Sequence, residues 1–418
     1  MPEPLTLAEA LEWLDCHVNR EAIDAAARDA LWKPPPPTLE RMRELMGLMG
    51  EPQHLQPIIH VTGTNGKTST SRLIINLLAG RGLSIGGYSS PHLERLNERI
   101  TRNLEPIPDD DLADVLTGLA TLEPYLDANR TPTYFEVMTA AAFRWFADVA
   151  VDVAVIEVGV GGTWDATCVA DGEVGVITNI DIDHVEYLGT TRESIARDKA
   201  GIARPGATLV VGERDPDLAP IFAAAGAGEV WMVGEEFACE ENIQALGGRS
   251  LTLRTPGATY SEVYLPLLGA HQGDNAACAL AAAEAFFGGP LDPEVVHEAF
   301  GAATSPGRLE VVGRRPLVVL DGAHNPAGMA ALSSAVEEEL GLARARVYVV
   351  GMFRGKDPVE MLEALDAPAA ALVVCVPPPW PRALPAEDVA AAARQLGCQT
   401  AVASTVGEAL ALAFDAAS

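Results

Sequence analysis

The sequence predicts an α/β protein: a phosphate-loop domain with a mostly parallel sheet flanked by helices, followed by a smaller Rossmann-like α/β domain. Three observations predict this class. Short apolar runs alternate with helical segments along most of the chain. Residues 149–160 are almost all valine, alanine and isoleucine, as in a strand buried on both faces. The 418 residues exceed what one core usually organises, and a loop at Thr304-Ser305-Pro306-Gly307 separates residues 1–305 from 306–418.

The central segment of the first domain is a glycine-punctuated loop, Gly63-Thr64-Asn65-Gly66-Lys67-Thr68. It follows the apolar run 58–62 and precedes an amphipathic helix predicted over 71–78. The N-terminus of such a helix binds anions through free N–H groups and its dipole. Lys67 can reach terminal phosphate oxygens, and the Thr68 hydroxyl can contact Mg²⁺. Val61 replaces the first glycine of the usual pattern, so a glycine turn with an incidental surface lysine is the alternative. We expect a nucleotide site that includes Thr64, Asn65, Gly66, Lys67 and Thr68.

The other elements follow in order. Helical spacing over 5–30 is broken by prolines at 34–37, and a second helix is predicted over 39–49. Buried strands are predicted over 83–88, 149–160 and 174–178, and two more within 202–233. Residues 251–268 alternate in polarity, which predicts antiparallel strands at the edge of the sheet. Helices over 275–287 and 292–300 precede strands over 316–320 and 346–351, which repeat the β-α-β pattern in the smaller domain.

Composition restricts the classes of partner. Lysine and arginine total 29 against 58 acidic residues, a formal charge of −29, which opposes binding to nucleic acid or anionic membranes. The six cysteines show no C-x-x-C spacing, which fits a reducing cytosol. We find no signal peptide and no uncharged apolar run long enough to span a bilayer. The sequence predicts a cytoplasmic protein, monomeric, with small-molecule substrates.

Three further residues follow or flank the predicted strands. Glu157 ends the most apolar strand and precedes glycines, so we favour a Mg²⁺ ligand over a turn carboxylate. His184 also follows a strand, and a structural histidine is an equal alternative. Lys199 lies at a helix end, where a surface lysine is the default interpretation.

These residues belong to a series of short motifs that occur in a specific order. The motifs are Gly63–Thr68, Ser89-Ser90-Pro91-His92, Thr133-Tyr134-Phe135-Glu136, Glu157-Val158-Gly159-Val160-Gly161-Gly162, Asp183-His184, Asp198-Lys199-Ala200-Gly201, His271-Gln272 with Asn275-Ala276, Pro306-Gly307-Arg308, and Asp321-Gly322-Ala323-His324-Asn325-Pro326. From about residue 10 to the C-terminus, the chain resembles the folylpolyglutamate synthase/dihydrofolate synthase family of the Mur ligase superfamily.

The resemblance implies an ATP-dependent amide ligase. A carboxylate of dihydropteroate, or of the terminal glutamate of a reduced folate, would take the γ-phosphoryl group, and L-glutamate would attack the acyl phosphate. ATP and Mg²⁺ are the implied cofactors, with K⁺ as a further candidate cation. Lys67 would stabilise the transferred phosphoryl group.

The resemblance also assigns site residues by position. Ser90, Glu157 and His184 would bind the metal, and Lys199 would be the carbamylated lysine of the family. Asn275, Arg308 and Asp321 would hold ATP, and His324 would lie near the phosphates or the glutamate. The pterin side would be lined by Thr133, Tyr134, Phe135, Glu136, Trp164, Asp165 and Ala166.

Two departures and two alternatives accompany this assignment. Cys168 replaces the usual asparagine of the family, and Lys67-Thr68-Ser69 replaces a frequent Lys-Gly, as in the cell-wall Mur ligases. One alternative is a ligase of the UDP-muramoyl-peptide or cyanophycin type, which the Ser89–His92 and Thr133–Glu136 motifs disfavour. The other is a nucleotide-binding protein without catalysis, which the complete set of motifs disfavours. A dehydrogenase is excluded because no G-x-G-x-x-G has a ribose-binding acid at the required spacing.

Overall fold

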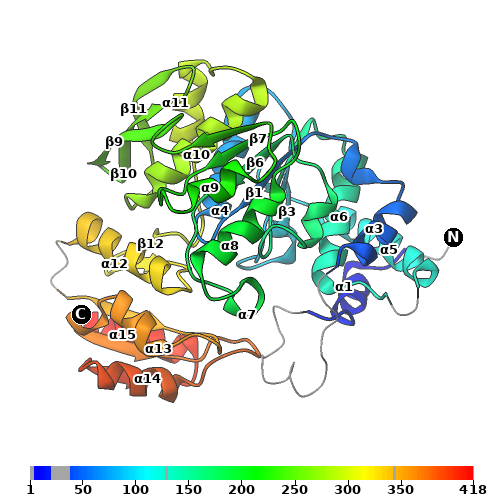
Figure 1. Ribbon diagram of the computed structural model, residues 1–418. Helices are drawn as coiled ribbons and strands as arrows, with labels where there is room; N and C mark the ends of the chain where they lie inside the picture. The colour runs from blue at the N-terminus through cyan, green and yellow to red at the C-terminus, as the bar shows by residue number, and fades with distance from the viewer. Residues whose placement is uncertain (1–3, 20–37, 128–129, 342–344, 418) are drawn as a thin grey trace. The chain divides into compact units, whose positions relative to one another are not determined.

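The computed structural model describes residues 4–19, 38–127, 130–341 and 345–417. These residues form two compact units (Figure 1). One holds the described residues up to Ser305 except 268–270, and the other holds 268–270 and the described residues from Pro306 onward. No helix in the described part of the chain is long and apolar enough to cross a membrane.

The first unit is built on an eight-stranded sheet with the order β4-β3-β2-β5-β1-β6-β7-β8. Six of these strands are parallel, and β3 and β4 add antiparallel at one edge. The predicted class, a mostly parallel sheet flanked by helices, is confirmed. The strand bounds are β1 Ile58–Thr62, β2 Ile85–Tyr88, β3 Ile100–Arg102, β4 Glu105–Pro106, β5 Val153–Glu157, β6 Val174–Ile177, β7 Thr208–Val211 and β8 Glu229–Met232.

Helices cover both faces of this sheet because successive side chains of its central strands point to opposite sides. Val153 and Val155 belong to one apolar cluster, whereas Ala154 and Ile156 belong to another. The first cluster includes helices α4 Lys67–Gly80, α10 His271–Phe287 and α11 Pro293–Gly301. The second includes α1 Leu7–Asp15, α3 Glu40–Leu48, α5 Asp109–Leu122 and α6 Tyr134–Asp148. Three further α-helices of this unit are α7 Val185–Leu188, α8 Arg192–Lys199 and α9 Ala219–Ala223.

Two expectations for this unit were wrong in detail. The strand predicted over 149–160 is only β5, because the backbone N–H groups of residues 149–151 bond back to α6 and form the turn that ends this helix. The helix after the phosphate loop begins at Lys67 and is buried on most of its surface, so it is not amphipathic. It packs against α10 and α11 as well as the sheet. Residues 20–37, which include the four prolines, lie outside the described residues.

The antiparallel strands predicted within 251–268 do not join the main sheet. They form a separate three-stranded sheet with the order β11-β10-β9, made by β9 Ala238–Ala245, β10 Gly248–Arg254 and β11 Thr259–Leu265. Their buried residues, among them Leu251 and Val263, pack on the apolar cluster that contains α10. Figure 1 shows this sheet beside α10 and α11. Alternation in the sequence predicts a half-buried sheet and does not specify which sheet a strand joins.

The second unit is a smaller α/β unit, as expected. Its three-stranded sheet is parallel in the order β14-β15-β16, with β14 Val347–Val350, β15 Leu372–Cys375 and β16 Thr400–Val402. Helices α12 Pro326–Leu340, α13 Pro358–Ala364, α14 Ala386–Gln395 and α15 Val406–Ala417 accompany it. One expectation was wrong. The strand at 317–320 does not extend the parallel sheet, because β13 Leu317–Leu320 pairs antiparallel with β12 Glu310–Arg314.

Candidate active site

The candidate site lies at the carboxyl edge of the main sheet of the first unit. Strands β2, β5, β1 and β6 are neighbours in that order. Their C-terminal ends lead to Ser90, Glu157, the Gly63–Thr68 loop and His184, respectively. Ligands of open α/β sheets bind at this edge. The topology therefore gathers residues that are far apart in the sequence.

The phosphate loop closes tightly against its neighbours. Gly66 has a φ of 82°, and a Cβ at this position would lie 2.3 Å from Oδ1 of Asn275. Only glycine fits such a conformation at this distance. The Lys67 amine turns back over the loop and donates to the carbonyl oxygens of Gly63 and Thr64, each at 3.1 Å. The structure thus brings Asn275, predicted to bind ATP, to the phosphate loop.

Residues after β6 fix the backbone of the phosphate loop, although the sequence pattern predicts no site role for them. The Thr178 hydroxyl donates to the carbonyl oxygen of Asn65 at 2.6 Å, and the Asn179 side chain accepts the N–H of Asn65 at 2.9 Å. The Thr64 hydroxyl exchanges hydrogen bonds with the backbone of Asp181. The available signal was their position directly after a buried strand of the same sheet.

Glu157 and Thr68 form a pair of oxygen donors beside the loop. Glu157 is 1% exposed, and its carboxylate accepts a hydrogen bond from the Thr68 hydroxyl at 2.9 and 3.2 Å. Carboxylate and hydroxyl oxygens are hard ligands, and Mg²⁺ in nucleotide sites needs only one or two protein ligands besides phosphates and water. The donor set therefore fits Mg²⁺.

The other predicted metal ligands lie on the loops on either side. Ser90 follows β2, and His184 precedes α7 with a left-handed φ of 50°. The His184 backbone N–H donates to the Asp183 carboxylate at 2.8 Å. Among the residues that the structure describes, no group of three or more His, Cys, Asp or Glu side chains could by itself hold a metal ion.

Lys199 is not the surface residue that its helix-end position indicates by default. Its side chain is 4% exposed, and its amine donates to the carbonyl oxygen of Gly63 at 2.8 Å. Lys67 donates to the same oxygen. Burial and, to a smaller extent, the nearby charge of Lys67 lower the pKa of Lys199 to about 7, although three aspartates oppose this shift. About half of the Lys199 amine is then neutral at pH 7.

Three of the residues predicted on the pterin side also serve the fold. Thr133 and Glu136 form a reciprocal cap at the start of α6, in which each side chain accepts a backbone N–H of the other residue. Glu136 also pairs with Arg41 at 3.1 Å. Asp165 is buried and accepts the backbone N–H groups of Val160 at 3.1 Å and Thr167 at 3.0 Å.

The predicted aromatic residues lie near the site loops. A Cβ on Gly159 would lie 2.6 Å from the ring of Phe135, so this ring rests on the segment after Glu157. The guanidinium of Arg99, a buried residue, lies 5.8 Å from the ring centre of Tyr134. Trp164 lies near Tyr187 of α7, with ring centres 6.0 Å apart. Ala166 is buried at the start of the short helix Ala166–Val169.

In the second unit, the predicted residues cluster where β13 ends. Asp321 accepts the backbone N–H groups of Leu309 at 2.9 Å and Ala323 at 2.8 Å. A Cβ on Gly322 would lie 2.1 Å from the guanidinium of Arg308. The His324 Nδ1 lies 3.2 Å from the Gly322 carbonyl oxygen, to which it donates. The fold therefore brings together Arg308, Asp321 and His324.

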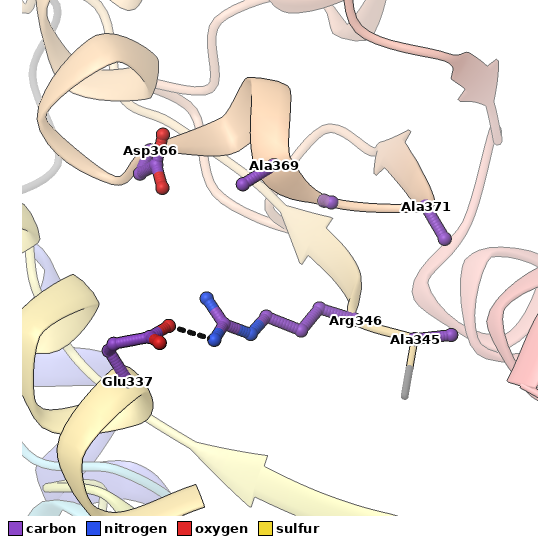
Figure 2. Close-up of a pocket in the computed structure, with 7 residues that line it drawn as sticks. Glu337, Ala345, Arg346, Asp366, Ala369 and Ala371 are labelled. Atoms are coloured by element: carbon purple, nitrogen blue, oxygen red, sulfur yellow. Dashed lines mark hydrogen bonds and ion pairs between the residues drawn. The ribbon is translucent and has the colours of Figure 1, made fainter. Parts of the chain in front are cut away.

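A cavity of about 350 Å³ in the second unit is a separate feature. It is lined by Glu337, Arg346, Asp366 and several alanines, and Figure 2 shows Arg346 paired with Glu337. It contains none of the predicted site residues, and its arginine is already neutralised. The chemistry belongs to the sheet edge rather than to this cavity.

Known proteins match both units. The Mur ligase middle domain matches residues 61–283, and the Mur ligase glutamate ligase domain matches residues 307–418. A dihydrofolate synthase/folylpolyglutamate synthase of Mycobacterium tuberculosis is 40% identical over 379 residues, which cover 85% of this chain and 77% of the relative. The Escherichia coli relative of the same name is 32% identical over 84% of this chain and 80% of its own length.

Solved structures agree with these relatives. The M. tuberculosis folylpolyglutamate synthase complexed with ADP has a TM-score of 0.89 at 39% identity, over 98% of this chain and 91% of that one. An FPGS–AMPPCP–folate complex has a TM-score of 0.80 at 29% identity, over 98% of each chain. Fold and site together define an ATP-dependent ligase with a phosphate loop. The chain belongs to the folylpolyglutamate synthase/dihydrofolate synthase family of Mur ligases, and as a member it is an ATP-dependent glutamate ligase.

Proposed function

We propose that this chain joins the amino group of L-glutamate to the carboxylate of dihydropteroate, to the terminal glutamate of a reduced folate, or to both. ATP would be converted to ADP and phosphate. The names of the relatives and the bound AMPPCP and folate of a similar structure support this proposal. The observation that carries it is the grouping of two lysine amines on the Gly63 carbonyl beside the Thr68–Glu157 pair.

The reaction has two steps whose atoms balance. A substrate carboxylate oxygen forms a bond to the γ-phosphorus, and the bond from that phosphorus to the bridging oxygen breaks, so ADP leaves. The glutamate nitrogen then bonds to the acyl carbon, phosphate leaves with the C–O electron pair, and the nitrogen loses a proton to solvent. Lys67 and the N–H groups at the start of α4 stabilise the charge on the transferred phosphoryl group.

Mg²⁺ is the cation that fits the oxygen donors of the site. Thr68 and Glu157 would hold it, with Ser90 and His184 contributing from the adjacent loops. When bound, it offsets negative charge on the phosphates. K⁺ is the second candidate cation. Replacing Glu157 by glutamine should raise the Mg²⁺ concentration needed for turnover, and an unchanged metal titration would assign Glu157 a structural role.

The surroundings of Lys199 support the carbamylation that the family resemblance implies. A neutral amine attacks CO₂, and the product loses a proton to become an anionic carbamate. Burial supplies the neutral amine at pH 7, since it lowers the pKa of Lys199 to about 7. The carbamate would lie beside Lys67, which offers a compensating cation. A carbonyl ¹³C resonance that appears with labelled bicarbonate, and is absent in Lys199→Met, tests this modification.

The two parts of the chain would divide the work. Residues 1–305 would bind ATP and residues 306–418 would act as the glutamate ligase domain, and the matches to the Mur ligase middle domain over 61–283 and to the glutamate ligase domain over 307–418 support this division. Asn275, Arg308 and Asp321 would contact ATP, and His324 would contact the phosphates or glutamate. We expect a monomer in the cytoplasm, and light scattering of the purified chain tests the oligomeric state.

The pterin would bind against aromatic rings. Phe135 and Trp164, which are half-buried, offer ring surface for stacking, whereas the buried Tyr134 and the capping or buried residues Thr133, Glu136 and Asp165 shape the surrounding backbone. Their contribution is indirect, through the position of α6 and of the segment after Glu157. Phe135→Ala should therefore raise the KM for the pterin substrate more than the KM for ATP.

One assay tests the proposed substrates. ADP release is measured with ATP and L-glutamate in the presence of dihydropteroate, tetrahydrofolate or a UDP-muramoyl peptide. We expect turnover with at least one pterin substrate and none with the muramoyl peptide. Lys67→Ala should abolish ADP release in every case while the far-UV circular dichroism stays unchanged. Turnover with the muramoyl peptide alone would refute the proposal.

A further inference from the structure

A buried chain of hydrogen bonds connects β1 to the segment that follows Glu157. His60, 1% exposed in the middle of β1, places its Nε2 2.8 Å from the Thr167 hydroxyl oxygen. That hydroxyl lies 2.6 Å from Oδ1 of Asp165. The other oxygen of Asp165 accepts the backbone N–H of Val160 at 3.1 Å. Every side chain in this chain of bonds is buried.

The chemistry of the groups assigns the protons. Burial lowers the pKa of His60 to about 3, so its ring is neutral. Burial raises the pKa of Asp165, and backbone N–H donors on both of its oxygens oppose that rise. Both oxygens of Asp165 accept backbone N–H groups, so the carboxyl group acts as an acceptor and the hydroxyl proton of Thr167 points to it. His60 must then donate from Nε2, and its Nδ1 is an acceptor.

This acceptor has no hydrogen-bond partner among the residues that the structure describes. A buried nitrogen without a partner costs free energy, and the face of the sheet that His60 shares is otherwise an apolar core. An aliphatic side chain would suit that core better. Stability alone therefore does not explain a histidine at this position. The hydrogen bond that His60 makes to Thr167 offers an explanation.

The segment held by this chain of bonds is the one that carries Glu157. Val160 lies three residues after Glu157, and the Thr62 hydroxyl fixes the next residue by donating to the Gly161 carbonyl oxygen at 2.6 Å. Besides the Asp165 contact, this backbone is held from β1, through the Val158 N–H on the Val61 carbonyl oxygen and the Thr62 hydroxyl on Gly161. The direction of the Glu157 carboxylate depends on that backbone.

We propose that His60 and Thr167 are positioning residues that act through Asp165 to hold the Glu157 segment in the geometry required for Mg²⁺. This inference rests on the proposed role of Glu157 as a metal ligand. Outer-shell partners of metal ligands typically change metal affinity by about 10- to 100-fold when they are removed.

The experiment compares variants that differ only in hydrogen bonding. Thr167→Val removes the hydroxyl at constant shape, and Thr167→Ser keeps it. His60→Leu removes the ring nitrogens, and His60→Gln keeps an N–H donor. Asp165→Asn, which has the same shape as the native residue, replaces one acceptor oxygen by a donor NH₂ group and so breaks the chain of bonds. Thr255→Val is the matched control, since Thr255 is a buried threonine of the separate three-stranded sheet.

The measurement is metal binding in the absence of turnover. Free Mn²⁺ is followed by electron paramagnetic resonance as each variant is titrated in the presence of ADP, with Mg²⁺ as competitor. We expect about 10-fold weaker binding in Thr167→Val, His60→Leu and Asp165→Asn. Binding should stay within about 3-fold of the native value in Thr167→Ser, His60→Gln and Thr255→Val. The double variant His60→Leu/Thr167→Val should bind Mn²⁺ no more weakly than whichever of the two single variants has the lower Mn²⁺ affinity.

Glu157→Gln separates this inference from the function on which it rests. If Glu157→Gln weakens Mn²⁺ binding and the folded Asp165→Asn and Thr167→Val proteins do not, the positioning role is refuted and the metal site stands. If Glu157→Gln itself binds Mn²⁺ as well as the native protein, both are refuted. A lower melting temperature with unchanged Mn²⁺ affinity identifies a purely structural network and also refutes the inference.

Discussion

Replacing Lys199 by methionine should remove a pH dependence from the stability of the first unit. Methionine fills a similar buried volume without a charge. The pKa of Lys199 is about 7 in the folded protein against an ordinary value of 10.5. Between these values the unfolded chain binds more protons than the folded one, so the native protein gains stability as the pH rises. The penalty for burying the cation is complete below pH 7 and disappears towards pH 10.5.

The size of the effect follows from the same two values. Each pH unit between these two pKa values changes the free energy of unfolding by about 1.4 kcal/mol. Between pH 7 and pH 9 the free energy of unfolding of the native protein should therefore rise by about 2 to 3 kcal/mol relative to Lys199→Met. At pH 7 the methionine variant should be the more stable protein, because it carries no buried amine.

Urea denaturation at several pH values measures this difference. A Trp380→Phe background removes the tryptophan among the described residues of the second unit from the fluorescence signal. Buffers are purged of CO₂, since a carbamate that forms only on the folded protein would add stability of its own. Lys356→Met, in the second unit, is the control and should leave the pH dependence unchanged. A constant difference between native and Lys199→Met proteins from pH 7 to 9 would show that the Lys199 amine is not the group that titrates.

Two further predictions concern the phosphate loop and its helix. Gly66→Ala should raise the KM for ATP by at least 10-fold, because the added Cβ would lie 2.3 Å from the Asn275 side chain. Gly82→Ala is the control. Gly82 has a similar φ of 84° and open space around it, so its substitution should lower the free energy of unfolding by only about 1 kcal/mol. Equal KM values in the two variants would contradict this. Arg72 donates to the carbonyl and hydroxyl oxygens of Thr304 at 2.7 and 2.8 Å. Arg72→Ala should therefore lower the free energy of unfolding, measured by urea denaturation, by about 1 to 2 kcal/mol. An unchanged urea midpoint would contradict this prediction.

The sequence was sufficient for features that depend on local pattern. An apolar run, glycines at fixed spacing and a following helix predicted the phosphate loop, and Glu157 was found because a carboxylate ends the most apolar strand. Both features lie where parallel strands end, so the order of elements alone places them at one edge. Pattern did not reveal that α4 is buried on most sides, because its polar residues Ser69, Thr70 and Ser71 are small enough to enter the core.

Other features depend on contacts between distant parts of the chain. Lys199 has the sequence context of a surface lysine, and only the fold carries its amine to the Gly63 carbonyl. The family resemblance placed Asp165 and Glu136 on the pterin side, and only the fold shows that both also accept backbone N–H groups. His60 is a polar residue within an apolar strand, and nothing local indicates that its partner is Thr167. Such pairings are specified by tertiary structure.

Three buried threonines explain how this site keeps its shape. The hydroxyl of Thr62 donates to Gly161, that of Thr178 to Asn65, and that of Thr167 lies against Asp165. Thr62 ends β1 and Thr178 follows β6, where a β-branched side chain suits the strand and a hydroxyl can still reach an adjacent loop. Each bond satisfies a polar group that burial would otherwise leave unpaired. The phosphate loop and the segment after Glu157 are therefore held by hydrogen bonds from neighbouring elements, and a site fixed in this way spends little free energy on reorganisation when phosphate charge develops.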